Sequence, residues 1–505
     1  MRIMAIKIST LLRCIIVMLS AAILLSFFSF HEELTYIDGF GILLIQMICL
    51  VLFLALGKFS TKYPPVIIVA VNLILFVIIR FLVLIFYPES FFGGRAVSSS
   101  MTGAFMNGML LYMLLGTIAC VFGISFGLGG NTRANVSMKQ GYDFTRLLGV
   151  AFFFVIIFRL ANYYVSGYVG STGSGEHLNF FNRYIMRLLD PQALLIMILA
   201  SYYAHKTERK NYKAVLISTL VGYFLYVSLI GSRSVLLDII IILLYFSIII
   251  YGDFVLNVRL RHLFLLLIAP LSIAVFFFVG AIRTVQFSAL NISFFDMINI
   301  VSQMDFSEFD LKTIVTDISY RVSFFESLFF PMYGTDVGFY DISAIVNYKT
   351  AFLSSLNRII PWKILGNILF LEYAFQYYMN YETTSVITES GRVDNIGYLW
   401  TMFGMSYQLF GYAGGILFIF LFTSAIAFLI KLPKRMRSFE GCVYGMLSVY
   451  VLDMWVKNVG IDNLIDRSFH LAVILLIYNS VLKILSPVKN EAIIINKMGA
   501  QHSKA

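Results

Sequence analysis

Long apolar runs separated by short polar segments dominate the chain. A helix that crosses a bilayer needs about 20 consecutive apolar residues. Runs of this kind predict membrane spans at 14–30, 39–57, 66–87, 105–126, 147–165, 191–205, 214–231, 235–251, 263–282, 411–430, 440–456 and 467–485. The pattern therefore predicts an all-α polytopic membrane protein with about 12 transmembrane helices.

One long segment, from Arg283 to Asp394, contains no such run but is rich in Tyr and Phe. It is too aromatic for disorder, and loops longer than about 15 residues usually carry a function or form a small domain. We expect a folded, mostly helical cap that forms one wall of an active site. The chain then divides into 1–282 (nine spans), 283–395 (the long outer loop), 396–485 (a re-entrant segment and three spans) and 486–505 (a cytoplasmic tail).

Composition and charge support this division. Of 505 residues, 60% are hydrophobic and 13% charged, a balance typical of membrane proteins. The net charge of +10 does not indicate nucleic acid, because the basic residues gather in alternate connections. With the N-terminus inside, the inner segments hold Arg2, Lys7, Arg13, Lys58, Lys62, Arg133, Lys139, Arg146, Lys206, Arg209, Lys210, Lys213, Arg259, Arg261, Lys431, Lys434, Arg435, Arg437, Lys483, Lys489, Lys497 and Lys504.

The short outer loops hold fewer basic residues, namely Arg95, Arg183, Arg187, Arg233, Lys457 and Arg467. This positive-inside asymmetry predicts an outer long loop and two cytoplasmic termini. The first apolar run is long and lacks a small-x-small cleavage pattern, so we expect an uncleaved span. A span at 396–410 would break the charge pattern, which favours a re-entrant segment leading into Gly411. Gly123 and Gly127 predict close helix approach, as do Gly411, Gly414 and Gly415.

Arginines near the outer ends of spans are the first candidates for chemistry. Arg80 and Arg159 fall within spans, Arg233 follows a turn at Gly231-Ser-Arg-Ser234, and Arg283 follows the ninth span. An ionisable residue inside a bilayer is unfavourable by at least about 2.5 kcal/mol, which makes it a functional candidate. The planar guanidinium suits diphosphate oxygens. The alternative is that each arginine reaches the interface or pairs with a carboxylate, such as Asp238.

Carboxylates of the long loop are candidate general bases, because transfer of a sugar to a hydroxyl requires proton removal. Eleven Asp and Glu residues lie there, and the sequence does not choose among them; Glu326, Glu382 and Glu389 are the candidates we carry forward. The loop contains no histidine, and the outward His31, His177 and His470 make no ligand set. We therefore expect neither a metal site nor a cofactor.

Three short patches resemble the bacterial O-antigen and oligosaccharide repeat-unit polymerases (Wzy type). They are Gly231-Ser-Arg-Ser234 opening a span, Asn357-Arg-Ile-Ile-Pro-Trp-Lys363 in the long loop, and Phe410-Gly-Tyr-Ala-Gly414 at a span entry. The resemblance covers most of the chain as architecture, with about twelve spans and a large outer loop before the last ones.

The resemblance implies an inverting, metal-independent glycosyltransferase with a GT-C-like helical fold in the bacterial inner membrane. It would polymerise undecaprenyl-diphosphate-linked repeat units into a surface polysaccharide such as O-antigen of lipopolysaccharide or capsule. The family's diphosphate-binding arginines correspond to Arg233 and Arg283, and less closely to Arg159 and Arg80. Its partners would be the lipid-linked oligosaccharide, membrane lipid, a chain-length regulator and a flippase, with no nucleic acid.

Three other functions remain open. An O-antigen ligase shares the architecture, but that family uses a histidine in its long loop. A lipid-linked oligosaccharide flippase could also have about twelve spans, with internal repeats and short loops expected. A non-enzymatic assembly protein leaves the intramembrane arginines unexplained.

The charge pattern makes a direct prediction about topology. A cysteine placed at Ser343, in the long loop, is expected to react with a membrane-impermeant maleimide added from outside. A cysteine at Ser438, in a basic connection, is expected to stay unlabelled because it faces the cytoplasm. Labelling of intact cells at position 438 alone would invert the topology and remove the outer active site with it.

Overall fold

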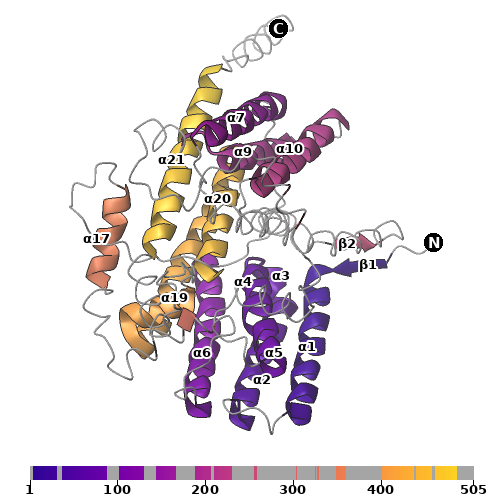
Figure 1. The fold of residues 1–505 in the computed structure, drawn as a ribbon, viewed down its shortest axis with the longest axis vertical. Coiled ribbons are helices and arrows are strands. Elements are labelled where there is room, and N and C mark those ends of the chain that lie inside the picture. The colour runs from indigo at the N-terminus through magenta and orange to yellow at the C-terminus, as the bar shows by residue number, and fades with distance from the viewer. Residues whose placement is uncertain are drawn as a thin grey trace, which may run out of the picture. The chain divides into compact units, whose positions relative to one another are not determined.

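The computed structural model describes residues 4–30, 37–87, 102–129, 144–166, 188–205, 210–229, 255–258, 348–359, 401–436, 439–457 and 461–485. It also describes Asn299, Gln303, Phe325, Ser327, Leu328 and Met332. Apart from two short strands, the described elements are helices (Figure 1).

The helices begin and end as follows: α1 Ile8–Phe30, α2 Gly39–Leu54, α3 Ser60–Lys62, α4 Val66–Leu73, α5 Ile79–Phe86, α6 Gly103–Leu128, α7 Thr145–Ser166, α9 Pro191–His205, α10 Lys210–Leu229, α17 Tyr348–Ile359, α19 Met402–Met436, α20 Phe439–Lys457 and α21 Ile461–Leu485. Two π-helical segments, η2 (Ala55–Phe59) and η3 (Ile74–Ile78), interrupt the α-helical winding. Each expected span that falls on described residues coincides with a helix. The spans expected at 235–251 and 263–282 lie outside the described residues.

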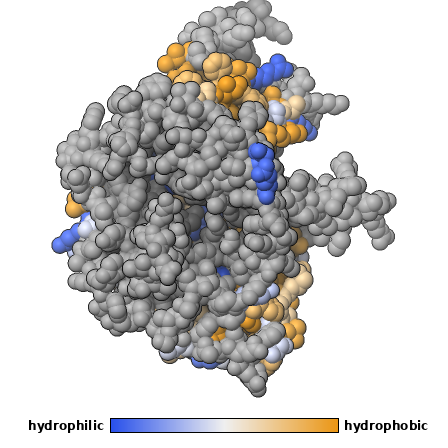
Figure 2. All heavy atoms as spheres, viewed as in Figure 1, coloured by the Kyte–Doolittle hydropathy of each residue, from blue (hydrophilic) through white to orange (hydrophobic). Residues whose placement is uncertain are grey.

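Six stretches of the described chain are long and apolar enough to cross a membrane. They are Ile8–Ser29, Gly39–Lys62, Val66–Phe86, Gly103–Leu128, Met402–Lys431 and Arg467–Ile484. Large apolar side chains on them are exposed, among them Leu25 and Phe126, and Figure 2 shows hydrophobic residues at the molecular surface. An apolar exterior of this kind is expected where lipid replaces water. The protein is a helical, multi-pass membrane protein.

The chain forms two compact units. Unit 1 comprises Met1–Val136, Val227–Arg435 and Tyr444–Phe469, and unit 2 comprises Ser137–Tyr226, Met436–Val443 and His470–Ala505. In unit 1, α1 packs on α2 and α5, and α2 packs on α6 (Figure 1). The first helix begins at Ile8 rather than at residue 14, so Arg13 lies inside it.

A two-stranded antiparallel ribbon also belongs to unit 1. Strand β1 (Met4–Lys7) pairs with β2 (Val255–Val258), and Lys7 lies opposite Val255. The two strands come from the N-terminal segment and from the connection between the expected spans 235–251 and 263–282. The ribbon therefore joins two segments that the charge pattern assigns to the same side of the membrane.

Glycines allow α6 to approach α19 closely. A Cβ atom built on Gly127 would lie 2.2 Å from the Ser424 carbonyl oxygen, and one on Gly123 would lie 2.7 Å from that of Phe420. Only a residue without a side chain fits at these positions, so the expected close approach of Gly123 and Gly127 is confirmed. Near the C-terminal ends of the same two helices, Lys431 Nζ donates a 2.9 Å hydrogen bond to the Gly129 carbonyl.

Helix α19 changes direction at Gly411. This residue has φ 67° and ψ −163°, a conformation that favours glycine. The helix thus consists of a short segment before Gly411 and a longer one after it. Gly415 leaves room for a side chain of α6, since a Cβ built on it would lie 2.2 Å from the Tyr112 hydroxyl.

In unit 2, α7 packs against α9 and α10. The Phe152 ring lies 6.3 Å from the Tyr223 ring, and Gly149 leaves room for Val215. On the two helices that enter this unit late in the chain, Lys483 Nζ lies 3.2 Å from a Glu440 carboxylate oxygen. That pair is partly exposed and contributes little to stability.

The close contact between α6 and α19 predicts that alanine destabilises the protein at one glycine and not at another. Gly127→Ala is expected to lower the free energy of unfolding by about 1–3 kcal/mol, because the added methyl group meets backbone atoms that cannot move aside. Gly39→Ala is the matched control, since a Cβ there meets no atom within 4 Å. Thermal unfolding of the purified protein in detergent measures both. Equal midpoints for the two variants would contradict the close contact.

Candidate functional site

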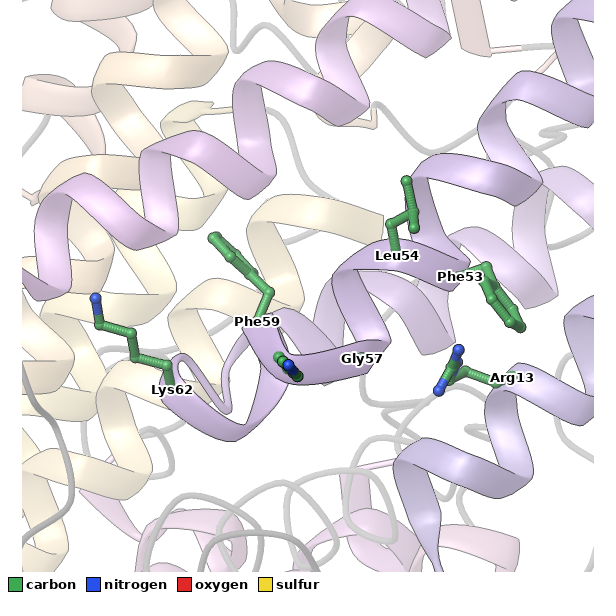
Figure 3. Close-up of a pocket in the computed structure, with 7 residues that line it drawn as sticks. Arg13, Phe53, Leu54, Gly57, Phe59 and Lys62 are labelled. Carbon is green, nitrogen blue, oxygen red and sulfur yellow. The ribbon is translucent and has the colours of Figure 1, made fainter.

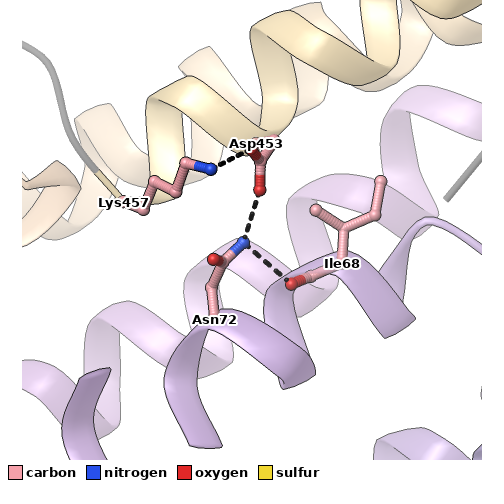
Figure 4. Close-up of polar contacts among 4 residues, drawn as sticks. All are labelled: Ile68, Asn72, Asp453 and Lys457. Carbon is pink, nitrogen blue, oxygen red and sulfur yellow. Dashed lines mark hydrogen bonds and ion pairs between the residues drawn. The ribbon is translucent and has the colours of Figure 1, made fainter. Parts of the chain in front are cut away.

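A buried carboxylate, a buried lysine and a buried amide form one connected group in unit 1. On α20, Lys457 Nζ lies 2.5 Å from Asp453 Oδ2. The other carboxylate oxygen, Oδ1, accepts a 3.0 Å hydrogen bond from Asn72 Nδ2 on α4 (Figure 4). The same amide donates to the Ile68 carbonyl at 3.1 Å. Asn72 and Asp453 are fully buried and Lys457 is 8% exposed.

Neighbouring polar contacts hold α20 in register with the rest of the unit. Trp455 Nε1 donates a 3.1 Å hydrogen bond to Thr423 Oγ1 on α19. The Thr423 hydroxyl in turn donates to Cys120 Sγ on α6 at 3.7 Å. Side-chain contacts therefore tie the charged end of α20 directly to α4 and α19, and through Thr423 to α6.

The π-helical segment η3 sets the direction of Arg80. An α-helix returns to the same face after about seven residues, and a π-bulge adds one residue to that count. Asn72 and Arg80 are eight residues apart with η3 between them. They therefore project toward nearly the same side, roughly 10 Å apart along the helix axis. Arg80 is fully buried.

Residues of the long loop pack against this part of unit 1. The Phe325 ring lies 5.9 Å from that of Phe81, the residue after Arg80. Ser327 Oγ lies 2.7 Å from Thr401 Oγ1, and a Cβ on Gly404 would lie 2.2 Å from the Ser327 carbonyl oxygen. Phe325 and Leu328 are fully buried. This piece of the loop is thus an integral part of the helical core.

Arg159 has a different environment, in unit 2. Its Nη1 donates a 3.1 Å hydrogen bond to the Tyr226 hydroxyl. The charges of Arg159 and Asp190 both act on Tyr226 and on Tyr478, and Tyr478 donates to the Leu188 carbonyl at 2.6 Å. Arg159 is thus grouped with a carboxylate and two phenols of the protein. No bound ligand is needed to explain an arginine at this position.

The other expected site residues are Arg233, Arg283, Glu326, Glu382 and Glu389, and all lie outside the described residues. Arg80 and Arg159 belong to different units. The expected convergence of the arginines therefore stays a prediction. Glu326 is flanked by Phe325 and Ser327, which are both buried.

Asn72, Asp453 and Lys457 are the polar residues that sequence reasoning missed. Asp453 falls inside the apolar run 440–456. The free-energy cost of placing a charge there makes it a candidate functional residue. The charge pattern predicts Lys457 in a short outer loop, whereas the structure shows it within a helix. Lys457 ends α20 and is buried, because it is placed one helical turn after Asp453 and neutralises it.

Among the described residues, no three His, Cys, Asp or Glu side chains gather in an arrangement that could hold a metal ion. Comparison of the whole chain with protein-family models, with curated proteins and with solved structures gives no match.

The buried ion pair predicts that the effects of substituting its two residues on the free energy of unfolding are strongly non-additive. Lys457→Met alone is expected to destabilise the protein by about 3–5 kcal/mol, because it leaves the Asp453 carboxylate buried without its cation. Adding Asp453→Leu is expected to recover most of this loss. Unfolding free energies of the two single variants and the double variant give the coupling. Simple additivity would show that Lys457 reaches solvent instead.

Proposed function

We propose that this protein is a Wzy-type polymerase, which joins lipid-linked oligosaccharide repeat units at the outer face of the bacterial inner membrane. One observation carries the proposal. A fully buried arginine, Arg80, lies on a helix able to cross a membrane, and the next residue, Phe81, packs against Phe325 of the long loop. A candidate diphosphate ligand and the candidate catalytic loop thus meet in one unit.

The chemistry of the donor explains why arginine belongs there. In an undecaprenyl diphosphate donor, the diphosphate leaves as the new glycosidic bond forms, and negative charge grows on its oxygens. A guanidinium held in an apolar surrounding stabilises that charge more strongly than one in water, without reorganising. Arg233, Arg283 and Arg80 are the proposed ligands, and together they would supply the positive charge that a metal ion supplies in other transferases.

Proton removal from the acceptor hydroxyl requires a base near the arginines. Glu326 is the candidate best supported by its neighbours, because Phe325 contacts Phe81 and Ser327 contacts Thr401. Glu382 and Glu389 remain alternatives. Removal of a carboxylate from water favours its protonated form and so makes it a stronger base, which is what this role requires.

The proposed architecture has about twelve spans, a GT-C-like arrangement and cytoplasmic termini. The ribbon supports it, since β1 and β2 come from segments expected on the same side. The bond between Lys431 and the Gly129 carbonyl joins two further segments expected on that side.

A flippase is the second candidate, and the Asn72–Asp453–Lys457 group is the observation that favours it. Buried carboxylate–lysine pairs within spans occur along proton and ion paths of transporters. A ligase remains the third, although the long loop has no histidine.

Deletion of the gene separates the three functions. Loss of a polymerase leaves single repeat units on the lipid carrier or on the final acceptor. Loss of a ligase leaves long chains on undecaprenyl diphosphate, and loss of a flippase leaves lipid-linked single units at the cytoplasmic face, closed to impermeant reagents. Glycan analysis of the deletion strain is expected to give the first result. Either other pattern rejects the polymerase.

Complementing that strain tests the arginines. Arg80→Lys and Arg233→Lys are each expected to lower polymer synthesis about a hundredfold, because a point charge does not replace the two-pronged guanidinium. Arg146→Lys, at the first turn of α7, is the control expected to restore long chains. Wild-type polymer from either test variant at normal protein levels would remove that residue from the site.

A further inference from the structure

A pocket of about 680 Å³ opens between α1 and the second candidate span, at the end where Gly39–Lys62 finishes. Its lining combines three cations, Arg13, Lys58 and Lys62, with apolar side chains of Phe53, Leu54 and Phe59. Among these lining residues, which the structure describes, there is no Asp or Glu. The described lining therefore carries three positive charges, at the end of a stretch able to cross a membrane.

The helix geometry explains why three cations gather there. Because α1 begins at Ile8, Arg13 lies in its second turn, at the level where the neighbouring span ends. Gly57 departs from helical geometry with ψ −132°, inside the π-helical segment η2. This break redirects the chain, so that Lys58 and Lys62 follow at the mouth of the pocket. Both lysines are exposed.

Arg13 is held in place by an aromatic ring. Its guanidinium carbon lies 4.0 Å from the centroid of the Phe53 ring, and Figure 3 shows the two side chains facing each other from neighbouring helices. The Arg13 Nε atom is buried and has no hydrogen-bond partner among the described residues. A cation–π contact orients the guanidinium but leaves its N–H donors available.

We propose that Arg13, Lys58 and Lys62 bind the phosphate headgroup of an anionic phospholipid. Basic pockets between transmembrane helices recognise such headgroups. The guanidinium donates to phosphate oxygens, the two lysines neutralise the charge, and the apolar wall contacts the first part of an acyl chain. The exposed Leu54 extends that wall toward the bilayer. This site does not depend on the proposed polymerase activity.

The test uses the purified full-length protein in detergent, titrated with short-chain phosphatidylglycerol, short-chain phosphatidylcholine or inorganic phosphate. Calorimetry is expected to show saturable binding of phosphatidylglycerol and none of phosphatidylcholine. Arg13→Gln, Lys58→Gln and Lys62→Gln are each expected to weaken binding about fivefold, and the triple variant roughly a hundredfold. Lys213→Gln, an exposed lysine at the start of another apolar helix, is the control expected to bind as the wild type does.

Three outcomes overturn the proposal. If inorganic phosphate binds as tightly as phosphatidylglycerol, the pocket serves a soluble anion rather than a lipid. If the triple variant binds phosphatidylglycerol like the wild type, the three cations do not form the site. Lys58→Glu is the companion variant, because Lys58 is exposed and its reversal leaves packing intact. Unchanged affinity in Lys58→Glu likewise rejects the site, whether or not the triple variant folds.

Discussion

The ion pair between Asp453 and Lys457 determines how unit 1 can pack. A charge in an apolar bundle is tolerated only where the surrounding structure satisfies it, so α20 is held where Asn72 of α4 can reach the carboxylate that Lys457 neutralises. Those contacts fix α20 against α4, and the hydrogen bond from Trp455 to Thr423 fixes it against α19. Apolar side chains alone would specify the arrangement poorly, because lipid is as apolar as they are. Polar contacts and small residues therefore select one packing.

Helix positions were the part of the fold that the sequence predicted well. A bilayer requires long apolar runs, so the run itself marks the helix, and Gly123 and Gly127 marked the close contact of α6 with α19. Helix ends were predicted less well, since an apolar run does not show where helical winding begins. Arg13 was expected before the first helix and lies inside it. The two π-helical segments have no sequence signal of their own, because a π-bulge depends on packing around it.

The candidate site was predicted only in part, for a related reason. The rule that a buried charge is costly identifies Arg80, and it applies equally to Asp453, which lies inside an apolar run. Contacts between distant segments were beyond the sequence altogether. Nothing in the pattern of hydrophobic residues indicates that Phe325 lies beside Phe81, or that Asn72 meets a residue 381 positions later. The long loop had been expected as a cap over the spans. Its described residues Phe325, Ser327 and Leu328 are buried.

Each of the two π-helical segments contains or closely precedes a charged residue and changes the direction in which that side chain projects. Segment η3 turns Arg80 toward the face that carries Asn72, and η2 with the break at Gly57 brings Lys58 and Lys62 to the pocket of Arg13. A regular helix would point Arg80 about 80° away from Asn72, a quarter of a turn from the polar face. An inserted residue changes that direction without breaking the helix or exposing its backbone to lipid. In a bundle where loops cannot enter the hydrocarbon, this is one of the few ways to direct a polar group. The π segments are thus the local irregularities on which both proposed sites depend.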